Sequence, residues 1–210
     1  MLRQLSICGV MLCSQLALAD VVALQIPFGS NDAGEVVLKN DGFRDQGGQA
    51  YLQMGFVTGE MAGVWVQVPS DIQYFKVDSF RVLFGSGDDQ KLNQAFFQMG
   101  IANQTSPSIP RDIENATQLT AGPYWNDIPA VGDGTKLPCA RAGQYVGAAL
   151  EFAHQGSPSV YRDLDGLQAP KNNTLFAVPG GWAYSAQYGL RGDWILRVVG
   201  HAATAEECNL

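Results

Sequence analysis

Short stretches in which apolar and polar residues alternate recur along most of this chain. In 63–68, Val64, Val66 and Val68 alternate with Trp65 and Gln67. A period of two is typical of a strand with one buried face. Turn-forming residues separate these stretches, which predicts many short strands. The predicted strands are Glu35–Lys39, Gln49–Val57, Gly63–Val68, Ile72–Phe84, Ala95–Ala102, Gln144–His154, Ser159–Arg162, Thr174–Val178 and Asp193–Gly200.

This arrangement predicts an all-β fold, an antiparallel β-sandwich in one domain over residues 20–210. No stretch keeps a helical period, and only Arg111–Leu119 is expected to form a short helix. The 24 glycines and 10 prolines are spread evenly, as in a turn-rich protein without a linker. The region Asn103–Ala142 lacks a strong strand pattern and is expected to be a functional loop or an excursion that covers one face.

The period of two also assigns faces to the strands. Ile195 and Val199 flank Arg197, so the last strand is expected to be covered on both sides. The positions assigned to the core are Val64, Val66, Val68, Phe80, Val82, Phe84, Phe97, Met99, Ile101, Val146, Ala148, Leu150, Phe152, Trp194, Leu196 and Val198.

Residues 1–19 have the pattern of a signal peptide. Arg3 precedes a mostly apolar run, and Ala17-Leu18-Ala19 matches a signal-peptidase site. The run is too short for a transmembrane segment. We therefore expect a secreted or periplasmic protein that starts near Asp20.

The charge of the chain argues against several partners. The net charge is −7, and −8 without the signal, which holds one basic and no acidic residue. The acidic residues are dispersed, and no basic cluster is present. Nucleic acid and anionic membranes are therefore not expected as partners.

Cys139 and Cys208 are the two cysteines that remain after the signal is removed. In an exported protein such a pair is expected to form a disulfide. It would close a loop of about 70 residues and hold the C-terminal tail.

The end of the chain has a recognisable motif. Gly181-Trp182-Ala183-Tyr184 is followed by Gly192-Asp193-Trp194-Ile195-Leu196-Arg197-Val198. This segment resembles the end of jelly-roll-like β-sandwich modules on exported bacterial proteins, and Gly59–Pro69 is similar to their opening strands. The resemblance covers about residues 45–200. It implies a jelly-roll-like fold and an accessory, adhesive or binding role, and it supplies no catalytic residue.

Candidate catalytic residues form no recognisable motif. Glu151 and His154 are an odd number of residues apart on a predicted strand, so they face opposite sides and cannot share a metal. The chain has neither a G-x-S-x-G elbow nor an H-E-x-x-H motif, although a Ser-His-Asp site assembled in space stays open. An acidic pair could serve a glycosidase, and the candidates are Asp78, Glu151, Asp163, Asp165 and Asp193.

Asp163-Leu164-Asp165-Gly166 resembles the start of a calcium loop, with oxygen ligands at alternate positions and a turn glycine. The later ligands of an EF-hand are missing, because Leu167 and Thr174 occupy the fifth and twelfth places. The alternative is a plain β-turn. If the loop binds a metal, we expect a structural calcium at Asp163 and Asp165. No other cofactor is expected.

Aromatic side chains are the main functional lead. Exposed rings on a β-sandwich can stack on sugars or fill a partner's pocket. The alternative is that they pack beneath loops or on a second covered face. The candidate ligand-binding residues are Trp65, Tyr124, Trp125, Trp182 and Tyr184.

Together these features favour an exported, non-catalytic binding or surface-interaction protein, with carbohydrate or an extracellular protein surface as its partner. One alternative is a secreted hydrolase of the glycosidase or esterase type that uses an acidic pair. Another is a structural subunit that assembles with copies of itself.

Overall fold

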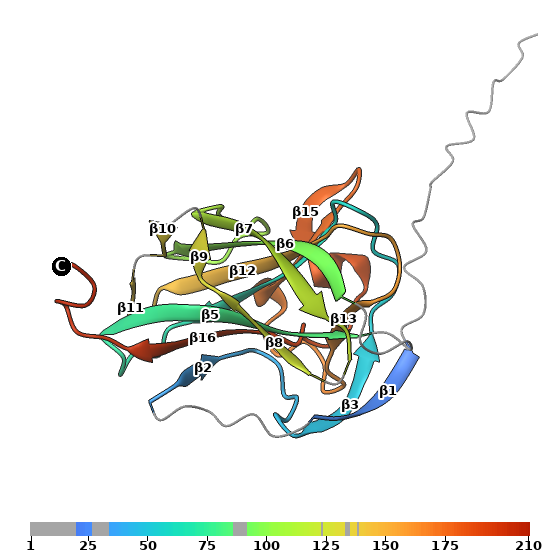
Figure 1. The fold of residues 1–210 in the computed structure, drawn as a ribbon, viewed down its shortest axis with the longest axis horizontal. Coiled ribbons are helices and arrows are strands. Elements are labelled where there is room, and N and C mark those ends of the chain that lie inside the picture. Colours follow the sequence, from blue (N-terminus) through green and yellow to red (C-terminus); the bar gives the residue numbers. More distant parts are fainter. Residues whose placement is uncertain (1–19, 27–33, 86–91, 123, 133–134, 138) are drawn as a thin grey trace, which may run out of the picture.

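A computed structural model describes residues 20–26, 34–85, 92–122, 124–132, 135–137 and 139–210, so the predicted signal peptide lies outside the described residues. The described chain is built of strands and two short 3₁₀ helices (Figure 1). The strands of the first half are β1 (Asp20–Gln25), β2 (Val36–Leu38), β3 (Gly47–Leu52), β4 (Met61–Gln67), β5 (Tyr74–Gly85), β6 (Leu92–Ala102) and β7 (Ile113–Thr120). The remaining elements are β8 (Trp125–Pro129), β9 (Val131–Gly132), β10 (Thr135–Lys136), β11 (Ala140–Arg141), β12 (Tyr145–Phe152), β13 (Ser159–Arg162), η1 (Pro170–Asn172), β14 (Asn173–Ala177), β15 (Gly181–Tyr184), η2 (Ser185–Tyr188) and β16 (Leu196–Ala202).

Two antiparallel sheets pack against each other, as predicted for a β-sandwich. The six-stranded sheet has the order β15-β14-β4-β12-β6-β7 and forms the upper layer in Figure 1. The eight-stranded sheet has the order β1-β3-β13-β5-β16-β2, with β8 and β11 also paired to β5. Among the described residues, no helix is long and apolar enough to cross a membrane.

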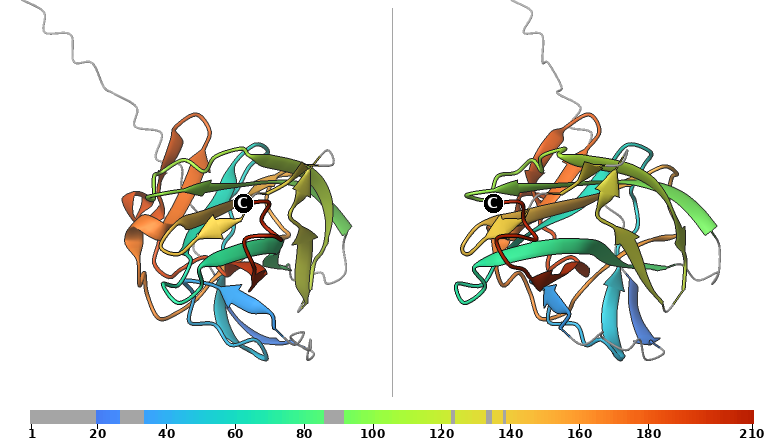
Figure 2. Two further views of the ribbon diagram at one scale, coloured as in Figure 1. Left: turned by 90° about the vertical axis from the view of Figure 1, so that its left-hand side faces the viewer. Right: turned by 60° about the vertical axis from the view of Figure 1, so that its left-hand side comes forward.

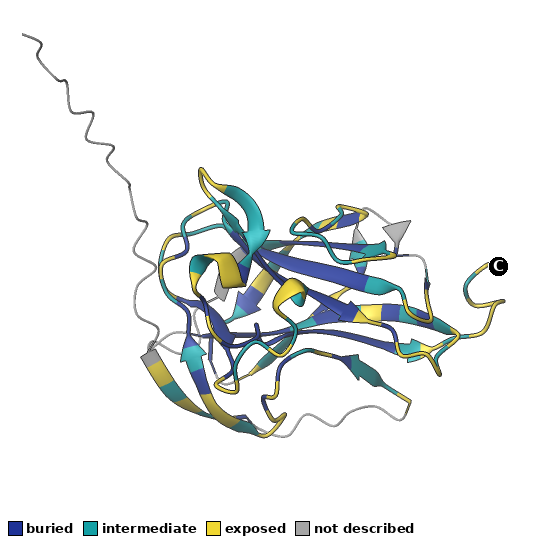
Figure 3. Ribbon diagram, turned by 180° about the vertical axis from the view of Figure 1, so that it is seen from behind, coloured by how far each residue is buried: buried dark blue, intermediate teal, exposed yellow. Residues whose placement is uncertain are grey.

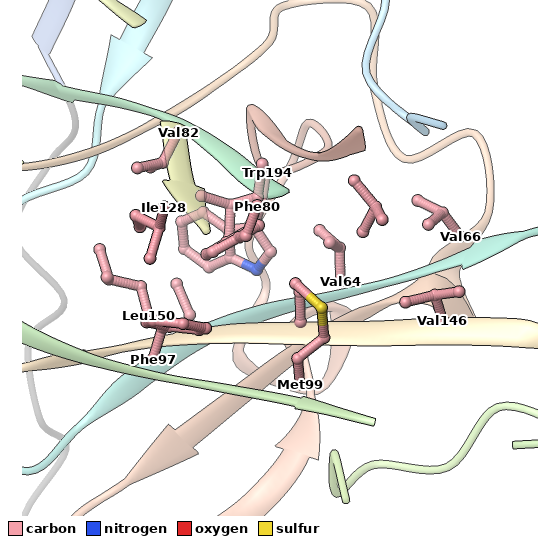
Figure 4. Close-up of a cluster of buried hydrophobic side chains, with 14 of the residues drawn as sticks. Val64, Val66, Phe80, Val82, Phe97, Met99, Ile128, Val146, Leu150 and Trp194 are labelled. Atoms are coloured by element: carbon pink, nitrogen blue, oxygen red, sulfur yellow. The ribbon is translucent and has the colours of Figure 1, made fainter. Parts of the chain in front are cut away.

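The main core lies between the sheets and contains the residues that the alternation predicted. Trp194 is fully buried there, and its indole nitrogen donates to the Ser185 hydroxyl (2.9 Å) and to the Thr174 carbonyl (3.1 Å). Figure 4 shows Trp194 beside Phe80, among the valines of β4 and the side chains of β6 and β12. The inner face predicted for Trp194, Leu196 and Val198 is confirmed, and so is the burial of Trp194.

A smaller second core covers the outer side of the eight-stranded sheet. Ile195 and Leu83 pack there against Leu52, Phe43 and Tyr161. Arg197 is 1% exposed, so the last strand is covered on both faces, as expected. The antiparallel pair of β1 and β3 lies at the edge of the molecule, where exposed and half-buried residues alternate along β1 (Figure 3).

The region 103–142 contains the strands β7 to β11, so it is not one long loop, although its first part, 103–112, is a loop that covers one face of the six-stranded sheet. Residues 113–120 form β7, so the predicted helix over Arg111–Leu119 is wrong. Ile113 and Leu119 face the core at the ends of β7, whereas Asn115 and Thr117 occupy the same face between them. These polar residues hide the period of two, and β7 tolerates them because it is the last strand of its sheet.

The disulfide between Cys139 and Cys208 is confirmed, with Cα atoms 5.6 Å apart. It joins the residue before β11 to the C-terminal tail, which lies beside β11 in every view (Figures 1 and 2).

Candidate functional site

The outer face of the six-stranded sheet carries three of the predicted ligand-binding rings. Trp65, Trp182 and Tyr184 all point away from the main core, because they alternate with core residues of β4 or are paired with outward positions of β14. Trp125 belongs to the other sheet, where it pairs with Leu83 of β5, and Tyr124 directly precedes this strand. The five rings therefore do not form one site.

Trp65 is buried, so the expectation that its ring is free for a ligand is wrong. Its side chain does lie opposite the valine face, but the loop 103–112 covers it. The Trp65 indole donates to the Ser106 carbonyl (2.8 Å), and Ile109 packs on the ring. Gly147 makes room for this ring, since a Cβ there would lie 2.8 Å from it. Trp65 supports the loop, and sequence could not reveal this because the loop comes 41 residues later.

The rings on the other sheet differ in exposure. Trp125 is half-buried beneath the Arg197 guanidinium, whose carbon lies 4.3 Å from the ring centroid. Its edge also meets Phe43, with the centroids 6.4 Å apart. Tyr124 is 39% exposed. Trp125 is therefore held in the second core, and Tyr124 stands at the surface next to it in sequence.

Trp182 and Tyr184 are half-buried on the edge hairpin of β14 and β15. Trp182 pairs with Phe176 across the hairpin, and the two rings meet edge to face at 5.5 Å. Phe176 pairs in turn with Met61 of β4. Met61 is 2% exposed and belongs to the cluster beneath the hairpin. The half-buried Trp182 ring is thus held against Phe176, which is paired with the buried Met61.

A row of directly paired residues continues across the sheet from this pair. Met61 pairs with Glu151 of β12, and Glu151 pairs with Phe96 of β6. We call this set the outer row: Trp182, Phe176, Met61, Glu151 and Phe96. Strands lie about 4.8 Å apart, so a row over five strands is about 19 Å long. Sequence periodicity gives the face of each residue but not the register, so the row is visible only in the structure.

Glu151 is the polar member of the outer row. Burial raises the pKa of its carboxyl group, and the charge of Glu114 adds to this, while the charge of Arg111 acts in the opposite direction. Arg111 is itself paired with Glu114 at 3.6 Å. Glu151 forms no hydrogen bond or ion pair within the described part of the chain. Water solvates the exposed part of this carboxylate, and a ligand that displaced that water would have to supply hydrogen-bond donors in its place.

The predicted calcium residues come together with a third acid. Oxygen atoms of Asp163, Asp165 and Asp193 lie within 4.8 Å of one another. Asp163 follows β13 and Asp193 precedes β16, where the backbone N–H of Asp193 donates to Asp163 Oδ1 (2.8 Å). We call these three residues the aspartate cluster. Hard carboxylate oxygens suit Ca²⁺, and Asp193 was not predicted as a ligand because it lies 28 residues beyond Asp165.

The electrostatics of the aspartate cluster are unusual. Burial raises the pKa of Asp163 to about 7, and the neighbouring Asp165 carboxyl adds to the effect. Burial also raises the pKa of Asp193 to about 6. Backbone N–H groups of Gly42 and Gln168 donate to Asp163 (2.8 Å) and Asp193 (3.0 Å). Within the described residues these carboxylates have no cationic partner inside ion-pair distance, so a cation or a shared proton would relieve their repulsion.

A hollow of about 310 Å³ adjoins the aspartate cluster and is lined by Asp163, Asp165 and the chain around Gly42. A Cβ at Gly42 would come within 2.0 Å of Asp165 Oδ2, so a larger residue there would displace that carboxylate. Paired acids beside a hollow are the feature expected of the hydrolase alternative. However, both oxygens of Asp163 already accept backbone N–H groups, which makes that residue a brace between segments rather than a free acid.

A larger hollow of about 680 Å³ lies on the outer side of the eight-stranded sheet. Arg81 crosses it and pairs with Glu35 (3.0 Å) and Asp127 (2.6 Å). His201 pairs with Asp78 at 2.6 Å in the same hollow. The charges of this hollow are thus largely satisfied within the chain, and none of its described lining residues is a predicted ligand-binding ring.

Comparisons with protein-family models, with curated proteins and with solved structures find no match for this chain. The fold and its sites define a β-sandwich protein with one disulfide, and its function must be inferred from its own residues.

Proposed function

We propose that this chain is an exported, non-catalytic binding protein that recognises a glycan through the outer row, with Trp182 as the half-exposed ring of the row and Tyr184 beside it on the same face of β15. The predicted signal peptide and the disulfide support the setting, because disulfides persist outside the cytoplasm. The resemblance of the closing segment to modules of exported bacterial proteins supports a binding role.

The outer row is the observation that carries this proposal. Trp182 offers a half-exposed indole whose position is set by strand pairing and by Phe176. A ring held in place loses little freedom when a ligand binds, so its contact area contributes to affinity. The row also places a carboxylate among apolar side chains, which is the combination of stacking and hydrogen bonding that a sugar needs.

The test is a glycan array probed with the purified protein, with Trp182→Ala and with Tyr124→Ala. The second variant removes a surface ring from the other sheet and is the matched control. We expect binding of the parent protein, a loss of at least about tenfold in Trp182→Ala and little change in Tyr124→Ala. Equal loss in both variants, or a loss only in Tyr124→Ala, would contradict the assignment of the site.

A further inference from the structure

We propose that the glycan bound by the outer row is an uncharged polysaccharide chain that lies across the strands, with Glu151 accepting hydrogen bonds from its hydroxyl groups. This inference rests on the proposed function and narrows it to one class of ligand.

The position of Glu151 argues for a ligand rich in hydroxyl groups. It stands between Met61 and Phe96 in the middle of the row, so anything that covers the row also covers this carboxylate. An apolar protein surface, or the same face of a second copy, would bury it without a donor, which is costly. Sugar hydroxyl groups supply donors at that point, and hydrogen bonds to a charged acceptor are the stronger kind.

Charge argues for an uncharged chain. Glu151 and Glu114 are close enough for the charge of Glu114 to raise the pKa of Glu151. Arg111 is the basic residue that acts on Glu151, and it is paired with Glu114. A uronic-acid or sulfated chain would bring more negative charge to these carboxylates and be repelled.

The shape of the row argues for a chain laid across the strands. Trp182 and Phe176 stand at one end and Phe96 at the other, about 19 Å away on a strand spacing of about 4.8 Å. The loop 103–112 occupies the neighbouring part of the face, where the side chain of Gln98 donates to the Ile109 carbonyl (3.2 Å). A ligand is thereby confined to the row, and its affinity should rise with chain length until it spans the row.

The array of uncharged, uronic-acid and sulfated chains tests the inference directly. We expect hits among uncharged chains alone and an affinity that levels off with length. Strongest binding to acidic chains that is lost in Trp182→Ala would overturn the inference and leave the proposed function standing. No binding to any chain, or Trp182-dependent binding of oligolysine instead, would overturn both.

Glu151→Gln supplies the second readout. The variant keeps the shape of the side chain and removes its charge, so we expect affinity for the best uncharged chain to fall about tenfold. The melting temperature should hold or rise, because Glu151 has no hydrogen-bond or ion-pair partner among the residues that the structure describes. Glu206→Gln, which removes an exposed carboxylate in the C-terminal tail, is the control. Unchanged affinity in Glu151→Gln would overturn the role given to this residue.

Discussion

Arg197 and Asp41 form a buried, two-pronged ion pair. Arg197 Nε donates to Asp41 Oδ2 at 3.0 Å, and its Nη2 donates to Asp41 Oδ1 at 2.6 Å. Their side chains are 1% and 0% exposed. The pair ties β16 to the segment that follows β2, from a position 156 residues earlier in the chain. The same guanidinium covers Trp125, so the pair also fixes that ring.

Removing one partner of this pair should destabilise the fold strongly. Asp41→Asn leaves the Arg197 charge buried with a weaker partner, and we expect the free energy of unfolding to fall by about 3–5 kcal/mol. Asp45→Asn is the matched control, because Asp45 also pairs with Arg197 but its side chain is 50% exposed. Its loss should cost less than about 1 kcal/mol. Urea denaturation measures the free energy of unfolding of both variants. Equal losses would contradict the claim that the burial of Asp41 makes its ion pair the more important one.

Trp194 should contribute both packing and hydrogen bonding. Trp194→Ala should lower the free energy of unfolding by about 3–5 kcal/mol, since it opens a cavity between the sheets. Trp194→Phe keeps most of the apolar area but leaves the Ser185 hydroxyl and the Thr174 carbonyl without the indole N–H. We expect a cost of about 1–3 kcal/mol for that change. A melting temperature unchanged in Trp194→Ala would contradict the observed burial.

The local sequence pattern is enough to predict the core residues, but it does not show which segments cover the outer faces of the sheets. Val64 and Phe80 were assigned correctly because alternation within one strand decides the face. The burial of Trp65 depends on Ser106 and Ile109, which come from a loop whose path no local pattern fixes. Sequence therefore predicts the strands that alternate clearly and their inner faces, but not β1 or β7. It also fails where a distant segment closes over an outer face.

The candidate sites also contain residues that the local sequence predicts and residues that only the fold brings together. Asp163 and Asp165 are predicted together because they are two residues apart. Asp193 joins them through the pairing of Arg162 with Trp194 and through the hydrogen bonds between Asp163 and Asp193. Trp182 was predicted from its residue type and motif. Its alignment with Glu151 depends on the register of three strand pairs, which the sequence does not encode locally.

The disulfide should stabilise the fold without defining it. Cys208→Ser should lower the free energy of unfolding by about 2–4 kcal/mol, because the bond closes a long loop in the unfolded chain. The fold should persist, since both cysteines lie outside the main core. Thermal unfolding with and without the substitution measures the effect. Two free thiols in the native protein, found by mass spectrometry, would refute the bond itself.

The aspartate cluster predicts an unusual dependence of stability on pH. Asp163 has its pKa raised to about 7 by burial and by Asp165, so the folded state holds a proton that the unfolded state releases near the ordinary value of 3.8. The stabilisation is complete below that value and is lost as the pH rises to about 7. In chelator-treated protein the melting temperature should therefore fall over this range, apart from the contributions of other groups.

Calcium should restore this loss if the cluster binds it, because binding to the folded state alone raises stability. We expect Ca²⁺ to raise the melting temperature at pH 7.5 and to do less at pH 5. Asp165→Asn should weaken both the calcium response and the pH slope, while the bonds from Gly42 and Asp193 to Asp163 stay in place. Asp71→Asn, at an exposed position, is the control. A calcium response that survives in Asp165→Asn would place the ion elsewhere.

The most direct test of the outer row is an NMR titration of the protein labelled at its tryptophan indoles. The chain has four tryptophans, and the indole N–H groups of Trp65, Trp125 and Trp194 already donate to Ser106, Asp45 and Thr174. Addition of the best uncharged glycan should shift the Trp182 indole resonance alone. A shift confined to Trp125, or saturable binding with no change at Trp182, would contradict the account.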